Sequence, residues 1–207
     1  MDTNDLKIKS ETYLTSLGIQ VPSHLPKIES LDDVNPKTAT QIASRLCALT
    51  YVIGMGFGAK HNDLLDDLQA YNLMDFVSPK EQQLLSQESL TEQQRINMAW
   101  QVECAQALAW CIGVVGFDHF KPCDSDLAQK IPFKTSPEPF IQHAERRSID
   151  AIQEQSDLLY RMHWYVRNCR LSGQESLLNE SVITERRKAI DWAYGVAEDW
   201  DNVPMDT

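Results

Sequence analysis

The stretch from Ile96 to Phe117 constrains this chain most, because Glu103 is its only charged side chain. A helix with so little polarity has to be surrounded by protein. A carboxylate inside such a helix requires a hydrogen-bonded or charged partner, or a raised pKa. We therefore expect Glu103 to mark a buried polar cluster within a helical core.

The same stretch is too polar to cross a membrane, because Asn97, Gln101, Glu103 and Gln106 fall within three turns. The N-terminal residues include early acids and no apolar run of signal-peptide length. The 5 cysteines form no C-x-x-C pair, which is typical of reduced thiols. We therefore expect a cytoplasmic protein that has no membrane partner.

Helix-start signals are frequent along the chain. Ser78 with Glu81 and Thr91 with Gln94 have capping-box spacing, and a proline after Ser78 suits a first helical turn. Apolar residues recur at helical spacing in the segments between such signals. We expect helices over residues 5–17, 37–57, 62–72, 79–86, 92–115, 137–145, 148–171 and 181–197.

No window alternates with the period of two that a half-buried strand needs. The sequence therefore predicts an all-α protein, a helical bundle of about eight helices with no significant sheet. Residues 1–207 fit a single domain, because a boundary near residue 130 would leave too short a C-terminal part for its own core. Glycine and proline are frequent over residues 113–139, a candidate hinge or loop.

The formal net charge of -11 argues against a nucleic acid or an anionic membrane as partner, since both attract basic surfaces. The charge is uneven: residues 130–190 carry ten Lys or Arg and eight Asp or Glu, a balance of +2, which leaves -13 for the remainder. Two interpretations remain open. This basic segment either folds against the acidic remainder or contributes a site for a small anionic ligand.

Glu103 shares a helix face with Trp100 and Trp110, and we look for its charged partner in the expected helix 148–171. Asp157 and Arg161, four residues apart, can pair within that helix. The candidate pocket or buried polar cluster consists of Trp100, Glu103, Trp110, Asp157, Tyr160, Arg161, His163, Trp164, Arg167, Glu185, Arg186, Trp192 and Trp200.

Two roles for this cluster remain open. Glu103, an arginine and His163, which falls on an apolar stripe, can form a buried ion pair that fixes helix packing. Alternatively, Glu103 is a general base in a pocket, with His163 as an acid and an arginine as an anion clamp. The sequence assigns no catalytic residue. We expect no cofactor and no metal, because the spacing from Asp118 to Asp124 matches no established metal site.

The acidic C-terminal segment contains Trp200, a large aromatic residue of a type that is usually buried and is uncommon in disordered tails. We expect Trp200 to dock on the protein, with Asp199 or Asp201 meeting arginines of the preceding helices.

Five sequence blocks in order carry a resemblance to a known family. They are SLGI-x-VPSHLP from Ser16, W-x-x-E at Trp100, D-L-x-Y-R-x-H-W from Asp157, E-R-x-x-A-x-x-W from Glu185 and D-W-D-x-V-x-x-D-T from Asp199. Together they resemble a bacterial family filed as domain of unknown function 4272. The stretch from Asp118 to Ser136 is less clear in this pattern. The resemblance implies an all-helical bacterial protein and transfers no functional residues.

The sequence as a whole predicts an acidic α-helical binding or interaction module. Its expected partner is another protein or a second copy, reached through an exposed aromatic or acidic surface. The alternative is a small-molecule-binding protein or an enzyme that uses the buried Glu, Arg and His side chains on an anionic ligand. A deep pocket lined by both Glu103 and His163 would favour this alternative, whereas a fully paired cluster would argue against it.

Overall fold

The computed structural model describes residues 2–207, and within this range its regular secondary structure consists of helices, with no strand. This confirms the predicted all-α class. The helices are α1 (Thr3–Ser16), α2 (Ala39–Gly56), α3 (His61–Ala70), α4 (Pro79–Leu85), α5 (Glu92–Trp100), α6 (Val102–Cys111), α7 (Leu127–Lys130), α8 (Glu138–Gln142), α9 (Ile149–Ser172) and α10 (Glu180–Tyr194), with 3-10 turns at Met74–Phe76 and Trp200–Asn202.

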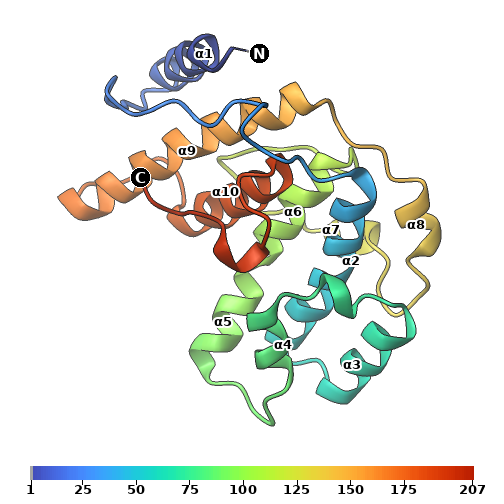
Figure 1. The fold of residues 1–207 in the computed structure, drawn as a ribbon. Coiled ribbons are helices and arrows are strands. Elements are labelled where there is room, and N and C mark those ends of the chain that lie inside the picture. Colours follow the sequence, from blue (N-terminus) through green and yellow to red (C-terminus); the bar gives the residue numbers. More distant parts are fainter. Residues whose placement is uncertain (1) are drawn as a thin grey trace.

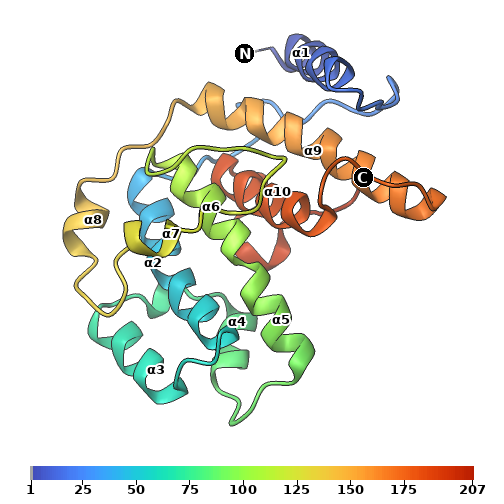
Figure 2. The ribbon, with the colours of Figure 1, turned by 180° about the vertical axis from the view of Figure 1, so that it is seen from behind.

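The helices pack in a series that runs from α1 through α9, α10 and α6 to α2 (Figures 1 and 2). α9 and α10 lie side by side, and α10 packs against α6 on its other flank. α2 also contacts α3, α4, α5 and α8, so these helices surround its far side. α1 lies across the outer face of α9, and the chain then crosses the molecule to reach α2 (Figure 1).

The core is centred on α2 and α6. Every residue of α6 from Glu103 to Cys111 is buried, as expected for a helix with one charged side chain. Burying apolar area in this way contributes about 25 cal/mol per Å² and is the main favourable term in folding. The structure contains no helix among residues 2–207 that is long and apolar enough to span a membrane.

Local sequence signals explain most helix starts. The predicted capping boxes of Ser78 with Glu81 and Thr91 with Gln94 are both formed. Asn35 precedes a proline but does not cap a helix; α2 starts after Thr38, whose own capping box is formed. α9 and α10 end at glycines in the left-handed region, Gly173 and Gly195, where a β-carbon would be strained.

The single helix predicted over residues 92–115 is wrong, because the chain breaks at Gln101 into α5 and α6. Just before this break, α5 lies directly against Gly56 of α2. A β-carbon at Gly56 would be 2.7 Å from the backbone nitrogen of Ala99. α6 ends at Cys111, and Gly113 then takes a positive φ of 76°.

Residues 113–139 contain α7 and connect α6 to α8. Hydrogen bonds attach this connection to the core. Gln106 binds the carbonyl of Gly116 and the amide of Asp124, and the Tyr51 hydroxyl accepts from the amide of Lys134. The hinge predicted for these residues stays a prediction. A hinge motion of this segment would have to break these hydrogen bonds.

Candidate functional site

Glu103 pairs with Arg186 of α10. One carboxylate oxygen accepts from Nε and Nη2 of Arg186 at 2.9 and 2.8 Å, and the other accepts from the amide of Cys123 at 2.8 Å. Arg186 also donates to the carbonyls of Asp118 and Lys121, at 2.6 and 2.9 Å. Both charged side chains are 1% exposed. All their polar atoms are therefore used within the protein, which fits the structural interpretation of the cluster.

The prediction that helix 148–171 supplies the charged partner of Glu103 is therefore wrong. α10 supplies it because α6 packs between α10 and α2. Within α9, the expected pair between Asp157 and Arg161 does form, at 2.7 Å, with both side chains 0% exposed. His163 is buried, as its place on the apolar stripe predicts, but its partner is Arg187 rather than Glu103.

The predicted tryptophans occupy separate places. Trp110 stacks on Phe117 and Trp100 is half-buried on α5, whereas Trp192 and Trp200 meet edge to face at 5.5 Å. Glu185 accepts from the thiol of Cys104. The cluster named from the sequence is therefore not one site.

Trp200 is 5% exposed, which confirms that it docks. Arg45 lies over its ring, with the guanidinium carbon 4.1 Å from the ring centroid. Asp201 accepts from the Ser78 hydroxyl and the Lys80 amide at the start of α4. Its partner is therefore the N-terminus of a helix and not the expected arginine.

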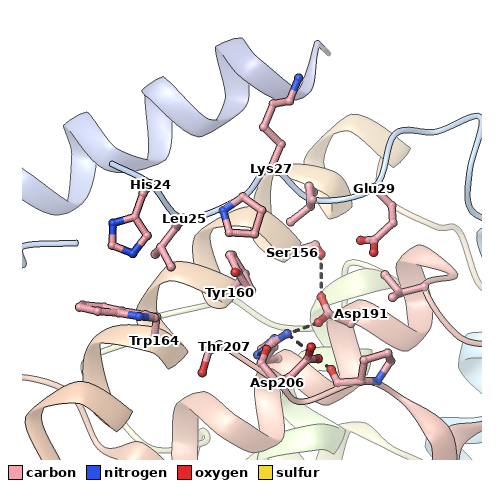
Figure 3. Close-up of a pocket in the computed structure, with 15 residues that line it drawn as sticks. His24, Leu25, Lys27, Glu29, Ser156, Tyr160, Trp164, Asp191, Asp206 and Thr207 are labelled. Carbon is pink, nitrogen blue, oxygen red and sulfur yellow. Dashed lines mark hydrogen bonds and ion pairs between the residues drawn. The ribbon is translucent and has the colours of Figure 1, made fainter. Parts of the chain in front are cut away.

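A cavity of about 550 Å³ lies between α9, α10 and two extended segments (Figure 3). We call it the strap pocket, and its outer wall, residues 24–29, the strap. Its inner wall is formed by Ser156, Tyr160 and Trp164 of α9 with Arg187 and Asp191 of α10. Residues 204, 206 and 207 of the C-terminal segment close its other side.

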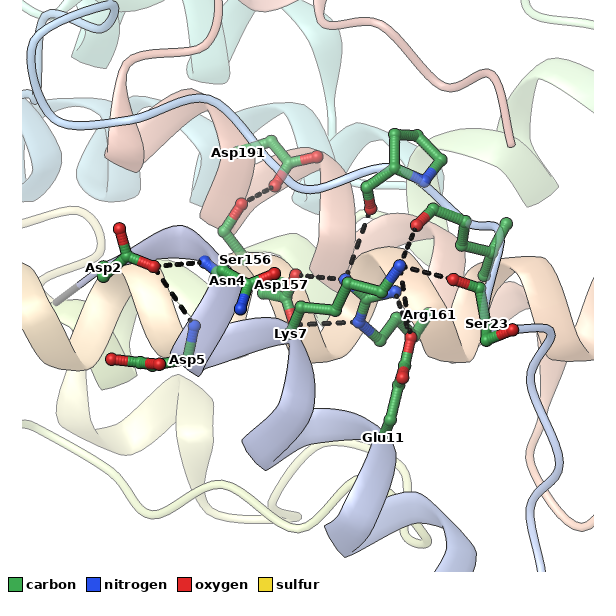
Figure 4. Close-up of polar contacts among 12 residues, drawn as sticks. Asp2, Asn4, Asp5, Lys7, Glu11, Ser23, Ser156, Asp157, Arg161 and Asp191 are labelled. Carbon is green, nitrogen blue, oxygen red and sulfur yellow. Dashed lines mark hydrogen bonds and ion pairs between the residues drawn. The ribbon is translucent and has the colours of Figure 1, made fainter.

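The strap is attached to three helices through its backbone carbonyls. Lys7 of α1 donates to the carbonyls of Ser23 and Leu25, at 2.5 and 2.6 Å, and Arg161 of α9 donates to that of Pro26 (Figure 4). Tyr194 of α10 donates its hydroxyl to the carbonyl of Glu29 at 2.8 Å. The outer wall of the pocket therefore has a defined position without a ligand.

Asp191 lies at the base of the strap pocket and is 4% exposed. It accepts from the Ser156 hydroxyl at 2.6 Å and from Nε of Arg187 at 3.1 Å. Burial raises the pKa of the Asp191 carboxyl to about 6, although the adjacent Arg187 opposes this shift. Carboxyl groups with a raised pKa are frequent at functional sites.

Arg187 links this base to the C-terminal segment. It donates to the carbonyl of Asp206 at 3.1 Å and to Nδ1 of His163 at 2.6 Å. A guanidinium can only donate, so Nδ1 of His163 has to carry the lone pair. His163 is accordingly neutral, and burial together with Arg187 lowers the pKa of its imidazole to about 4.

Sequence reasoning named part of this site and missed its base. Tyr160 and Trp164 line the pocket, and Arg161 holds the strap, while Arg167 reaches the hydroxyl of Thr207 at 3.4 Å. The missed residues are His24, Glu29, Ser156, Arg187, Asp191 and Asp206. One signal was present: Arg187 and Asp191, four residues apart, lie among apolar residues of α10, just as Asp157 and Arg161 do on α9.

No group of three or more His, Cys, Asp or Glu side chains arranged to hold a metal occurs within the part of the chain that the structure describes. The pocket instead combines a buried ion pair, two aromatic side chains and exposed carboxylates, which is an arrangement suited to binding an organic molecule.

Comparison with known proteins gives a family and no function. Neither the search of curated proteins nor the search of solved structures found a match. The family described as "Domain of unknown function (DUF4272)" matches residues 6–203, almost the whole chain. The protein therefore belongs to the DUF4272 family.

Proposed function

We propose that this protein is a helical binding module for a small organic molecule and that the strap pocket is its ligand site. The observation that carries the proposal is the cavity itself, about 550 Å³, with the buried pair of Asp191 and Arg187 at its base. Ligand sites of small molecules are concave, are largely preformed and have about 300–1,000 Å³ of volume with a few convergent polar groups.

The attachment of the strap supports this proposal. Loops that must be ordered on binding reduce affinity, because immobilising each flexible side chain or segment costs free energy. Lys7, Arg161 and Tyr194 fix the carbonyls of the strap in advance. A ligand would then meet a preformed wall.

Ligand-observed NMR with a fragment set that contains cations, anions and neutral molecules tests the proposal. Trp164 is half-buried in the pocket wall, and Trp100 is a half-buried tryptophan on α5. We expect fragments that bind the wild type to lose their signal with Trp164→Ala and to keep it with Trp100→Ala. Hits that survive Trp164→Ala, or no hits at all, would contradict the proposal.

A protein contact is a second candidate function, favoured by an apolar groove of about 240 Å³ between α2, α6 and α7. Phe57 at its edge is 71% exposed and Phe133 is 38% exposed. Exposed apolar surface of this kind marks contact sites. Light scattering of the wild type and of Phe57→Ser tests this by measuring the oligomeric state. A wild-type dimer that the substitution dissociates would support the contact. A monomeric wild type would show that a second copy of the chain is not the partner.

We also infer that the protein works in the cytoplasm. The five cysteines are all free, and four of them are buried. Free buried thiols are typical of reducing compartments. Localisation of a tagged full chain by fractionation tests this inference.

A further inference from the structure

We propose that the strap pocket takes an organic cation: a molecule with an ammonium group and a flat apolar body. This inference rests on the proposed function and adds the charge and shape of the ligand. It follows from carboxylates around the cavity that have no ion-pair partner, and from an aromatic side chain that lines the cavity without a stacking or cation–π partner in the described chain.

Three carboxylates surround the cavity, and one of them is balanced. Asp191 pairs with Arg187. Glu29 and Asp206 lie on either side of Asp191 (Figure 3), and neither has an ion-pair partner within 4.0 Å among residues 2–207. Glu29 is close enough to Asp191 to oppose its ionisation. An incoming cation would relieve this repulsion, whereas an anion would add to it.

The cations near the pocket do not pair with its exposed carboxylates. Lys27 lines the pocket, but its side chain extends away from Asp191 toward α1 (Figure 3) and forms no ion pair within 4.0 Å among residues 2–207. Arg161 is matched by Asp157 at 2.7 Å and by Glu11 at 3.3 Å.

Arg187 is also occupied. It donates to Asp191, to His163 and to carbonyls of the C-terminal segment, so its hydrogens are directed at protein acceptors. Arg167 remains as a cation beside Thr207. Among the residues that line the pocket, the carboxylates of Glu29, Asp191 and Asp206 outnumber the cations of Lys27 and Arg187, which favours a positively charged ligand.

Trp164 supplies the apolar contact. Its indole lines the pocket opposite Leu25 and His24 (Figure 3) and makes no ring stacking or cation–π contact within the described chain. Tyr160, by contrast, already has Arg187 over its ring, with the guanidinium carbon 5.0 Å from the centroid. A flat or cationic group on the open face of Trp164 would gain stacking or cation–π attraction.

Two probes with the same ring and opposite charge test the inference. Tryptamine carries an ammonium group on a two-carbon chain, and indole-3-propionate carries a carboxylate on a chain of the same length. Titration calorimetry with the full-length chain at pH 7.5 and low salt measures both. We expect tryptamine to bind about tenfold more tightly or better, and added salt to weaken it.

Two exposed side chains provide variants that should fold. Glu29→Gln and Asp206→Asn are each expected to weaken tryptamine binding about two- to fivefold, the range of exposed ion pairs. Glu88→Gln removes an exposed carboxylate that does not line the pocket, and it should leave the affinity unchanged.

The outcomes separate the two proposals. If indole-3-propionate binds as tightly as tryptamine or more tightly, and Trp164→Ala abolishes its binding, the cation inference is wrong and the ligand site stands. If neither probe binds, the cation inference is wrong and the ligand site loses its support as well. Tryptamine binding that Glu29→Gln and Asp206→Asn both leave unchanged would also overturn the inference.

Discussion

Nη1 of Arg187 lies 2.6 Å from Nδ1 of His163, and this contact fixes the charge state of the histidine. Two groups that both donate a proton cannot share such a distance, so His163 is neutral in the folded protein. The same arginine holds Asp191 through Nε. A single guanidinium therefore connects the base of the strap pocket, the C-terminal segment and a titratable imidazole of α9.

The neutral state of His163 predicts sensitivity to acid. Its folded pKa of about 4 lies below the ordinary histidine value of 6.5, so the unfolded chain binds the proton more readily and stability falls as the pH drops below 6.5. His163→Gln removes the titrating imidazole. Between pH 7 and pH 5 the unfolding free energy of the wild type should fall by about 2 kcal/mol more than that of the variant, as measured by urea denaturation. Equal losses would show that Nδ1 is not held unprotonated.

Asp191 has the opposite pH dependence. Its folded pKa of about 6 exceeds the ordinary aspartate value of 3.8, so its protonation stabilises the fold at low pH and that contribution is lost as the pH rises through 6. Asp191→Asn has no carboxyl group at this position and cannot take up the proton. The advantage of the wild type over this variant should grow by about 1 kcal/mol from pH 7 to pH 5 in the same denaturation series. A constant difference would indicate an ordinary carboxyl pKa.

The pair of Glu103 and Arg186 is predicted to be structural. Glu103→Gln leaves a buried guanidinium without a counter-charge, and removal of one partner from such a pair typically costs about 3–5 kcal/mol. Glu92→Gln is the control, an exposed glutamate on α5 whose replacement should change the unfolding free energy by less than about 0.5 kcal/mol. A small effect of Glu103→Gln would reopen a catalytic or binding role for this residue.

Lys7 is predicted to set the position of the strap. Lys7→Met removes hydrogen bonds to the carbonyl of Leu25 in the strap and to that of Ser23 just before it, and we expect faster hydrogen exchange at residues 23–29. Lys9→Met on the same helix is the matched control, because Lys9 pairs with Glu154 and does not reach the strap. Mass spectrometry of deuterated peptides resolves the two segments. Equal exchange in both variants would mean that the other bonds suffice.

Gly56 is predicted to be required for close packing of α2 against α5. A β-carbon there would be 2.7 Å from the Ala99 nitrogen, so Gly56→Ala forces the two helices apart and should cost about 1–3 kcal/mol. Gly116→Ala has no atom within 4 Å of the added carbon and no positive φ, and should be close to neutral. Thermal unfolding of the two variants measures the difference.

The fold could be predicted from the sequence because its signals are local. Capping boxes at Ser78 and Thr91 and the apolar stripes of α9 and α10 depend on residues within a few positions. The break at Gln101 could not be predicted, because it lies where α5 packs against Gly56, which is distant in sequence. Tertiary contact overrides propensity at this point.

The candidate site was harder to predict because it is assembled from distant segments. The sequence correctly indicated that Glu103 is buried, and it could not indicate that Arg186 is the residue that pairs with it. The strap pocket joins residues near position 26, two helices and the C-terminal segment. For its base, Asp191, the one signal in the sequence is Arg187 four residues before it, and burial by the fold is what raises the pKa of the Asp191 carboxyl.

The most direct test of the strap pocket is an NMR titration of the five tryptophan indole N–H groups with tryptamine. Trp164→Phe assigns the signal of the pocket residue. We predict that the Trp164 signal moves in a saturable way while those of Trp100, Trp110, Trp192 and Trp200 stay in place. A Trp164 signal that does not move, or one that moves no more than the other four, would contradict the account.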